Sequence, residues 1–334
     1  MRILIVAPSW VGDTVMAQPM FRLLHERHAN LTLDVLAPPF TLPLLKRMPE
    51  VRHSIVARFG HGELKFVERR RLARELQVER YDQAIVLPNS LKSALIPLLA
   101  KIPLRTGFRG EMRYGLLNDV RRLDERALPK MVERFAALAL DRGAMLTKPL
   151  PAPSLSVNTV NVKIIIEKQI LTGDTPIAVF CPGAEYGPAK RWPAEYFGAL
   201  AKQAAQNGYR VWLIGSPKDA AIGDDIVRSS NGACINLCGQ TTLDEAIDLI
   251  SLAALVVTND SGLMHVAAAL GRPLLALYGS SSPAFTPPLS TSAKIIKIDI
   301  ACSPCFKREC PLGHFNCMRH LTPEQVWQQV PAVT

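Results

Sequence analysis

The residues best suited to bind a charged ligand follow an apolar segment in the second half of the chain. Residues 252–257 predict a buried strand, and the polar turn 258–262 leads into an alanine-rich segment that predicts a helix. A strand, a tight turn and a helix start leave backbone N–H groups that can bind an anion. Asp260 and His265 lie at the edges of this turn, where the phosphate and ribose of a nucleotide would lie. The alternative is that Asp260 or Ser261 only caps the helix.

A second candidate is the loop 181–193, which is rich in glycine and proline. Gly183 would let the backbone approach a ligand closely. Lys190 and Arg191 place two cations shortly before a predicted helix, where the helix macrodipole favours negative charge. Two cations at a position that disfavours positive charge indicate a functional role, which would be to bind a phosphate. Exposed Lys-Arg pairs are common on surfaces, so a solvated pair is the alternative.

Several enzyme classes lack their sequence motifs in this chain. The dinucleotide motif G-x-G-x-x-G is missing, because the first turn holds only Gly12 and Gly215 stands alone in its turn. No Walker A motif, no G-x-S-x-G nucleophile elbow and no Asp-x-Asp pair occurs. A diphosphate bound by this chain would therefore be neutralised by side-chain cations and helix amides.

The elements that would position these turns alternate between strand and helix. Strands are predicted at 3–7, 31–36, 81–87, 177–180, 209–214, 234–237, 255–258 and 274–277. Helices are predicted at 14–28, 42–47, 63–79, 91–100, 131–141, 194–207, 219–229, 243–251 and from 322 onward. A loop is predicted at 105–114 and a linker at 148–160.

Repeated strand–helix units predict an α/β fold with doubly wound parallel sheets. The flagged loops all follow predicted strands, at 8–13, 88–90, 181–193, 215–219, 258–262 and 278–283. Doubly wound sheets bind ligands at the carboxyl ends of their strands, so a cleft between two such domains is the expected site.

Length and charge support two unequal halves. A chain of 334 residues predicts two domains. Residues 1–150 hold 25 Lys and Arg against 15 Asp and Glu, so the whole net charge of +10 belongs to this half. Nucleic acid, an anionic membrane surface and a phosphorylated substrate all fit such a half. For the basic run 69–74 a solvated helix face is the alternative.

No apolar segment reaches the roughly 18 residues of a membrane span, and the N-terminus lacks a basic leader, so a cytosolic protein is expected.

The seven cysteines fall into two groups. Cys181, Cys234 and Cys238 are isolated in apolar contexts and predict buried thiols. The other four lie within sixteen residues that also contain His314, and they are Cys302, Cys305, Cys310 and Cys317. This spacing is typical of a small zinc or iron–sulfur site. Free thiols that pack a proline-rich loop are the alternative, and a disulfide is not expected in a cytosolic chain.

Five blocks of the sequence resemble glycosyltransferase family 9, the heptosyltransferases of lipopolysaccharide synthesis, along nearly the whole chain. The blocks are 9–13 (Ser-Trp-Val-Gly-Asp), 87–94, 105–119, 181–193 and 258–265. The resemblance implies a GT-B fold, with two Rossmann-like doubly wound parallel-sheet domains facing across a cleft. Residues 1–155 would bind the acceptor and residues 156–334 ADP-heptose, with the C-terminal helix packing back on the first domain.

The resemblance also implies an activity. It would be an inverting, metal-independent transfer of L-glycero-D-manno-heptose from ADP-heptose to the first heptose of the inner core, on heptosyl-Kdo2-lipid A. The block 105–119 favours this acceptor. Alternatives are another family 9 transferase with a different core acceptor (heptosyltransferase I or III type) and a non-catalytic two-lobed sugar-binding protein. The implied partners are ADP-heptose, the lipid A–Kdo–heptose glycolipid and the anionic inner-membrane surface, with no nucleic acid. The chain would be cytoplasmic and peripheral at the inner face of the cytoplasmic membrane.

Residue roles follow from the matching motif positions. The general base of the family matches Asp13, whose alternative role is to cap a helix that starts at residue 14. The lysine that offsets charge on the leaving diphosphate matches Lys190. The donor-site acid and histidine match Asp260 and His265. The remaining donor-binding residues are expected to be Gly183, Arg191, Asp219 near the adenosine ribose, and the amides of Ser261 and Gly262.

The acceptor is anionic, because it carries Kdo carboxylates and phosphates. Four basic residues of the first half are assigned to it as a hypothesis, and they are Lys92, Arg105, Arg109 and Arg113. No cofactor is expected to be required. A structural zinc ion at the four clustered cysteines is a separate hypothesis.

Overall fold

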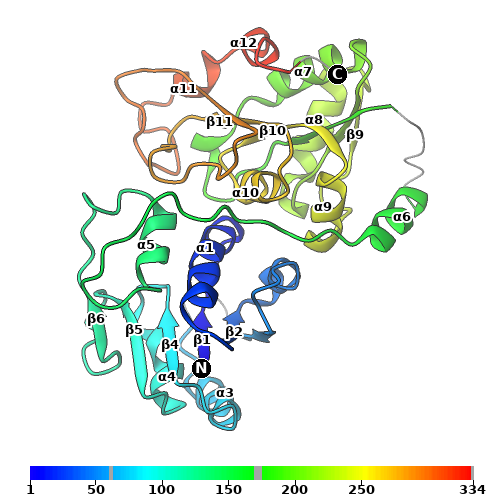
Figure 1. The fold of residues 1–334 in the computed structure, drawn as a ribbon. Coiled ribbons are helices and arrows are strands. Elements are labelled where there is room, and N and C mark those ends of the chain that lie inside the picture. Colours follow the sequence, from blue (N-terminus) through cyan, green and yellow to red (C-terminus); the bar gives the residue numbers. More distant parts are fainter. Residues whose placement is uncertain (60–62, 169–174, 332–334) are drawn as a thin grey trace. The chain divides into compact units, whose positions relative to one another are not determined.

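The computed structural model of the chain describes residues 1–59, 63–168 and 175–331. The chain divides into two compact units, Met1–Pro153 and Ser154–Thr334 (Figure 1). Each unit has a six-stranded sheet whose strand pairs are parallel. The predicted α/β fold with doubly wound sheets is confirmed. No helix in the described part of the chain is long and apolar enough to cross a membrane.

The first unit contains the sheet β3-β2-β1-β4-β5-β6. Its strands are β1 (Arg2–Val6), β2 (Thr32–Ala37), β3 (His53–Val56), β4 (Gln83–Val86), β5 (Leu104–Phe108) and β6 (Asp119–Arg121). Its helices are α1 (Val11–Arg27), α2 (Leu42–Leu45), α3 (Phe66–Gln77), α4 (Leu95–Leu99) and α5 (Met131–Ala137), with 3-10 turns η1 (Pro39–Thr41) and η2 (Leu91–Ala94). Helix α1 packs against α5 and α3 against α4.

The second unit repeats this plan in the sheet β12-β11-β10-β7-β8-β9. Its strands are β7 (Ile177–Cys181), β8 (Arg210–Leu213), β9 (Cys234–Asn236), β10 (Ala253–Asn259), β11 (Leu274–Tyr278) and β12 (Ala293–Lys297). Its helices are α6 (Thr159–Lys168), α7 (Ala194–Gln206), α8 (Ala220–Ser229), α9 (Leu243–Ile250), α10 (Gly262–Ala269), α11 (Asn316–Arg319) and α12 (Pro323–Trp327), with 3-10 turns η3 (Pro188–Lys190) and η4 (Pro217–Asp219).

Both sheets have the strand order of a Rossmann fold. In such a sheet the first and fourth strands lie side by side, and the strand order reverses at this pair. Ligands bind in the crevice at the carboxyl ends of these two strands. The reversal lies between β1 and β4 in the first unit and between β7 and β10 in the second. The loops 8–13 and 88–90, and the loops 181–193 and 258–262, are therefore the ones that meet at the binding edges.

The central strands are buried on both faces, which explains why their sequences are continuous apolar runs. In β1, Ile3, Leu4 and Ile5 have no exposed surface, and Val256 and Val257 of β10 are equally buried. These strands were predictable from hydrophobicity. The predicted loop at 105–114 is wrong in its first part, because β5 pairs with β4 there and buries residues 106–108.

The C-terminal helix was expected to pack on the first domain. The structure gives α12 a partner within the second unit, where it packs against α7. The ring of Trp327 lies edge-on to Tyr209, with 6.5 Å between centroids. The indole of Trp192 donates a hydrogen bond of 2.7 Å to the carbonyl of Leu321, just before α12.

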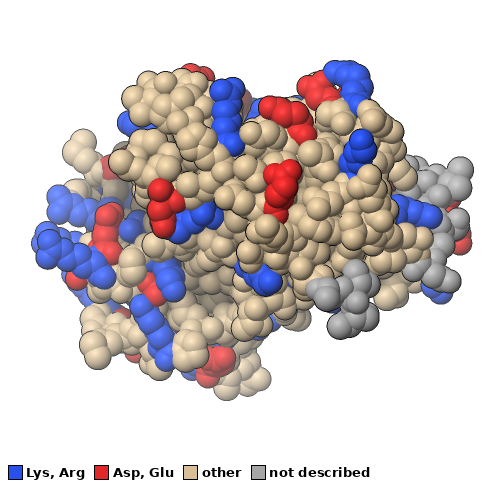
Figure 2. Space-filling view, turned by 90° about the horizontal axis from the view of Figure 1, so that it is seen from above, with Lys and Arg blue, Asp and Glu red and all other residues tan. Residues whose placement is uncertain are grey.

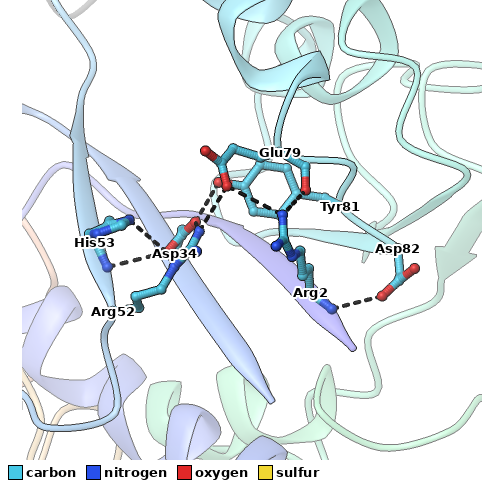
Figure 3. A network of polar contacts seen from close by, with 7 residues as sticks. All are labelled: Arg2, Asp34, Arg52, His53, Glu79, Tyr81 and Asp82. Atoms are coloured by element: carbon cyan, nitrogen blue, oxygen red, sulfur yellow. Dashed lines mark hydrogen bonds and ion pairs between the residues drawn. The ribbon is translucent and has the colours of Figure 1, made fainter. Parts of the chain in front are cut away.

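A polar network ties together strands β1, β2, β3 and β4 of the first unit near their amino ends (Figure 3). The buried carboxylate of Asp34 accepts hydrogen bonds from Arg52 at 2.9 Å and from the hydroxyl of Tyr81 at 2.6 Å. Burial acts to raise the pKa of Asp34, but the hydrogen bonds and charge of Arg52, with the Tyr81 hydrogen bond, bring this pKa below its usual value. Because this network lies at the end of the sheet opposite the binding edge, its role is structural.

Candidate donor and acceptor sites

The two candidate loops of the second unit meet at the carboxyl edge of β7 and β10. Thr258 pairs in register with Cys181, so the chain segments that follow both strands start side by side. Lys190, the last residue of η3, donates a hydrogen bond of 2.6 Å from Nζ to Oδ2 of Asp260. The side chains are 17% and 4% exposed, so this ion pair is largely shielded from water. The structure thus brings together two of the predicted donor-site residues that are 70 positions apart in sequence.

The start of α10 carries no side-chain cap. Ser261 is the N-cap by position, but its side chain makes no capping hydrogen bond, and its hydroxyl lies 3.3 Å from that of Thr258. The carboxylate of Asp260 pairs with Lys190. The alternative that Ser261 caps this helix with its hydroxyl is therefore wrong. The first N–H groups of a helix have no acceptor within it, and those of α10, including that of Gly262, follow directly after the carboxyl end of β10.

Asn259 holds the two loops together and was not assigned a role from sequence. Its side chain is completely buried. Oδ1 accepts a hydrogen bond of 3.0 Å from the backbone N–H of Trp192, and Nδ2 donates one of 2.7 Å to the carbonyl of Pro182. Both ends of the Lys190 loop are thus fixed to β10 by one side chain. Sequence showed only a polar residue at a strand end, which is a weak signal for this bridging role.

Gly183 and Asp219 lie against each other. A Cβ atom added at Gly183 would come within 2.4 Å of the Asp219 carboxylate, so a side chain at this position would have to displace that carboxylate. Oδ2 of Asp219 accepts hydrogen bonds from the backbone N–H and the hydroxyl of Ser216, at 2.9 and 2.7 Å. In the structure the group that lies close to Gly183 is the Asp219 side chain. The close approach of Gly183 to a ligand and the contact of Asp219 with a ribose both stay predictions.

Arg191 turns back toward its own loop. Its Nη2 lies 3.4 Å from the carbonyl oxygen of Ala184. Its Nε is buried and has no hydrogen-bond partner among the described residues. The hydroxyls of Ser280 and Ser281, in the loop after β11, are also buried and also have no partner among these residues. These hydroxyls belong to the flagged loop 278–283, for which sequence gave no residue-level role. Buried donors without partners at a binding edge are groups that a polar ligand can satisfy.

His265 lies inside α10 and is buried, close enough to Lys190 and Asp260 to interact with both charges. Burial lowers its pKa to about 4, the Lys190 charge adds to this effect, and the Asp260 charge opposes it. The imidazole is therefore neutral at pH 7, and it can donate or accept a hydrogen bond without adding charge to the donor site.

The buried His265 predicts a pH dependence of stability. The unfolded chain has the ordinary histidine pKa of about 6.5 and takes up the proton first as the pH falls. The free energy of unfolding should therefore decrease by about 3 kcal/mol from this residue between about pH 6.5 and about pH 4. Denaturant unfolding at about pH 7.5 and about pH 4.5 measures the decrease. H265N, which does not titrate, should lose less stability over the same range, and equal losses in both proteins would contradict the prediction.

In the first unit, Asp13 is the third residue of α1. The helix begins at Val11 with Trp10 as N-cap, so the alternative that Asp13 caps a helix starting at residue 14 is wrong. Its side chain is partly buried at the carboxyl edge of β1, the strand next to β4. An acidic residue in the first turn is favourable for the helix. The role of general base stays a prediction.

The four basic residues assigned to the acceptor divide into two kinds. Arg113 is 2% exposed, and its guanidinium donates to the carbonyls of Pro88 and Phe108 and to Oδ1 of Asn89. Burial lowers the pKa of Arg113. Arg105 donates at 2.7 Å to the carbonyls of Leu116 and Ile102. Both guanidinium groups thus hold loop carbonyls.

Arg109 and Lys92 have a different environment. Arg109 is exposed, and its guanidinium lies 5.9 Å from the ring centre of the exposed Tyr114. Lys92 lies in η2, beside the loop 88–90, and is partly exposed. These two side chains have access to solvent, which a ligand-binding cation needs.

The basic run 69–74 was also given the alternative of a solvated helix face. Arg69 does not belong to such a face, because it is buried and donates to backbone carbonyls, including that of Lys92 at 3.1 Å.

The four clustered cysteines are free thiols that line one cavity of about 180 Å3 together with His314. The backbone N–H groups of residues 312–315 face the sulfur of Cys310 and lower the pKa of its thiol. Burial and the three neighbouring thiols raise the pKa of Cys317. As placed, no three His, Cys, Asp or Glu side chains of residues 1–59, 63–168 and 175–331 form a site that could hold a metal ion.

The chain is similar to known proteins along its length. The profile described as Glycosyltransferase family 9 (heptosyltransferase) matches residues 69–316. Lipopolysaccharide heptosyltransferase 2 of Escherichia coli (strain K12) is 49% identical, over 100% of this chain and 98% of that protein. The protein of the same name from Salmonella typhimurium is also 49% identical, over 99% of this chain and 97% of that protein.

Solved structures agree with these sequence matches. The structure of E. coli ADP-heptose lps heptosyltransferase II has a TM-score of 0.88 and 48% identity, and the match covers 98% of this chain and 97% of that chain. E. coli heptosyltransferase WaaC with ADP-2-deoxy-2-fluoro heptose has a TM-score of 0.73 at 20% identity, over 98% of both chains, and shares the fold. The predicted GT-B class, with two Rossmann-like units, is confirmed.

Proposed function

Because the chain belongs to glycosyltransferase family 9, the heptosyltransferases, we propose that it transfers L-glycero-D-manno-heptose from ADP-heptose to the first heptose of the inner core, on heptosyl-Kdo2-lipid A. The full-length identity to lipopolysaccharide heptosyltransferase 2 supports this acceptor. The structural observation that carries the proposal is the shielded pair of Lys190 and Asp260 beside the uncapped start of α10. This arrangement supplies a cation and backbone N–H groups where a Rossmann-like sheet binds a diphosphate.

The proposed reaction is a single displacement. Asp13 takes the proton from the acceptor hydroxyl as its oxygen attacks the anomeric carbon of the heptose. The new bond joins that oxygen to the anomeric carbon, and the bond from this carbon to the diphosphate oxygen breaks. The electron pair of the broken bond leaves with ADP, and attack on the opposite face inverts the anomeric carbon.

Lys190 and the start of α10 offset the charge that develops on the leaving ADP. A lysine ammonium has three N–H donors, of which Asp260 takes one at 2.6 Å. The pair fixes Nζ in position, so little reorganisation is needed when negative charge builds on the diphosphate. The amides of Ser261 and Gly262 add partial positive charge, and the neutral His265 adds none. No metal ion takes part in this proposal.

The remaining donor contacts follow from position on the same edge. Asp260 presents a carboxylate to the sugar hydroxyls, and Asp219, after β8, faces the ribose. Gly183 permits this placement because a side chain at its position would displace the Asp219 carboxylate. Arg191 has a buried Nε available for a polar group of the donor.

Arg109 is the basic residue best suited to the acceptor, since it is exposed and lies beside Tyr114. R109A should raise the acceptor KM by roughly tenfold, which is about 1.4 kcal/mol of lost charge-assisted binding, and leave ADP affinity unchanged. R113A should instead lower the free energy of unfolding by about 3 kcal/mol, because it leaves buried carbonyls without donors. Steady-state kinetics and denaturant unfolding separate the two effects. A large loss of stability in R109A, or equal losses for both substrates, would contradict the assignment.

Helix α3 is the surface proposed to meet the anionic inner face of the cytoplasmic membrane. Its exposed side chains include Phe66, Val67 and three arginines, Arg70, Arg71 and Arg74, which outnumber the exposed Glu68 and Glu75. Apolar and basic side chains on one helix are the groups that bind anionic lipid. By contrast, acidic and basic side chains are interspersed on the face drawn in Figure 2, with Lys and Arg most frequent toward its left edge. The proposed location is therefore cytoplasmic and peripheral to this membrane.

The α3 surface predicts a measurable loss of vesicle binding. Replacing the three exposed arginines of α3 with glutamine should weaken binding to vesicles with anionic lipid by about 100-fold, at about 1 kcal/mol for each charge near the surface. Co-sedimentation measures the binding, and vesicles of neutral lipid are the control. Unchanged binding of the triple variant to anionic vesicles would contradict this role of α3.

The function is tested by the mass of the product. The purified protein is incubated with ADP-heptose and an acceptor that carries one heptose, and the acceptor should gain one further heptose. Release of ADP without transfer to this acceptor would favour a family 9 transferase with a different core acceptor. No turnover of any donor would favour a non-catalytic sugar-binding protein.

A further inference from the structure

The segment after β12 brings four cysteine side chains to one cavity. Two come from the turn 302–305 and two from the segment 310–317, and the cavity they line holds about 180 Å3. All four are partly exposed, so they are not simply core residues. The proposed heptose transfer uses none of them.

The geometry of this segment favours sulfur ligands over the imidazole. Nδ1 of His314 accepts a hydrogen bond of 3.0 Å from the backbone N–H of Asn316, so the neutral ring carries its proton on Nε2 and has no lone pair left for a metal ion. Meanwhile the backbone N–H of Phe315 donates to Sγ of Cys310 at 3.4 Å. Amide donors around a cysteine sulfur stabilise a thiolate, and such contacts surround metal-bound cysteines.

Two bulky residues next to these cysteines have left-handed backbone conformations. Phe306, directly after Cys305, has φ of 55°, and Phe315, two residues before Cys317, has φ of 53°. Such values are unfavourable for a side chain with a Cβ atom, and they persist only where the surroundings impose them. The cysteine turns are thus held in a specific shape that the local sequence does not favour.

The same segment packs directly on the loop that carries Lys190. Ala189 lines the cysteine cavity, and its N–H donates at 3.0 Å to the carbonyl of Arg308. The hydroxyl of Tyr186 donates at 2.9 Å to the carbonyl of Phe306. A Cβ atom at Gly187 would lie 2.4 Å from the Arg308 carbonyl oxygen, so the two backbones are in close contact.

We propose that Cys302, Cys305, Cys310 and Cys317 together bind one divalent transition-metal ion, Zn2+ or Fe2+, and that this ion braces the loop 186–190. Binding replaces four S–H bonds with four metal–sulfur bonds and releases the four protons to solvent. The side chains do not yet form a coordination sphere as placed, so the ion draws the sulfurs to the roughly 2.3 Å of a zinc–thiolate bond. The bracing role rests on the proposed function of Lys190, whereas the metal site does not.

The metal content of the protein tests the site. Protein purified without an affinity tag should contain about one zinc or iron ion per chain by mass spectrometry of the elements, which also tells the two metals apart. C310S should lose the ion, and C234A, a cysteine outside the cluster, should retain it. If C310S fails to fold, cobalt substitution of the wild-type protein provides the readout, because four thiolates give an intense sulfur-to-cobalt charge-transfer band. Metal-free native protein that also lacks this band after cobalt addition would overturn the site.

Hydrogen exchange tests the bracing of the Lys190 loop. Removing the ion with a chelator should speed amide exchange in peptides that cover residues 186–191, and peptides of α8 should be unaffected. Unchanged exchange at 186–191 after complete metal removal would overturn the bracing. Neither measurement uses a heptose donor or acceptor, so a failure here is distinguishable from a failure of the proposed transfer.

Discussion

K190A should lower kcat for heptose transfer by about 100- to 1000-fold, the cost of one lost donor to a developing anion. The loss falls on kcat because the leaving diphosphate gains charge in the transition state, and uniform binding would instead change KM. Lys190 is placed for this task by its contact of 2.6 Å with Asp260 and by the hydrogen bonds of Asn259 to both ends of its loop. Stopped-time transfer assays at saturating substrates measure kcat.

Two further variants make the Lys190 result interpretable. K190R keeps a cation beside the buried Asp260 and should recover part of the activity, whereas K190A leaves that carboxylate without its partner. K218A removes a lysine that is 72% exposed and paired with Glu185, and it should retain wild-type kcat. A K190A protein that is folded, by circular dichroism, and transfers heptose within threefold of the wild-type rate would contradict the proposed role.

D13N should lower kcat by about 100- to 10000-fold, the range expected when a general base is removed. Asparagine has nearly the same size and keeps a polar group in the first turn of α1, so the fold should be retained. The affinity for ADP should not change, because Asp13 is proposed to act on the acceptor. Transfer kinetics and titration calorimetry with ADP measure the two quantities.

The matched control for this variant is D141N. Asp141 is an exposed carboxylate that pairs with Arg27, the last residue of α1, at 2.8 Å. Its replacement should leave kcat unchanged, since an exposed ion pair contributes little. If D13N retained near-wild-type kcat across the neutral pH range, the proton would have to leave the acceptor by another route.

Sequence predicted the part of the fold that follows from hydrophobicity. Strands β1, β4, β7 and β10 are buried on both faces, so their apolar runs stand out. Strands β3, β6 and β12 were not predicted, because edge or short strands with exposed residues have no such run. Strand β5 forms through its pairing with β4, a long-range contact that local sequence does not report.

The candidate site was predicted at the level of loops and only partly at the level of side chains. The strand order explains why flagged loops meet at two edges. The pairing of Lys190 with Asp260 depends on the register of β7 and β10, which sequence spacing does not contain. Arg113 was assigned to the acceptor because its carboxylates and phosphates need cationic partners. A guanidinium has five N–H donors, however, and loop carbonyls that converge in three dimensions can bury it.

The configuration at the anomeric carbon of the transferred heptose is the most direct test of the proposed single displacement. A single displacement by an acceptor oxygen that Asp13 deprotonates must yield the configuration opposite to that in ADP-heptose. Nuclear magnetic resonance of the product distinguishes the two configurations. We expect complete inversion on the acceptor that carries one heptose, and retention of the donor configuration would contradict the single displacement.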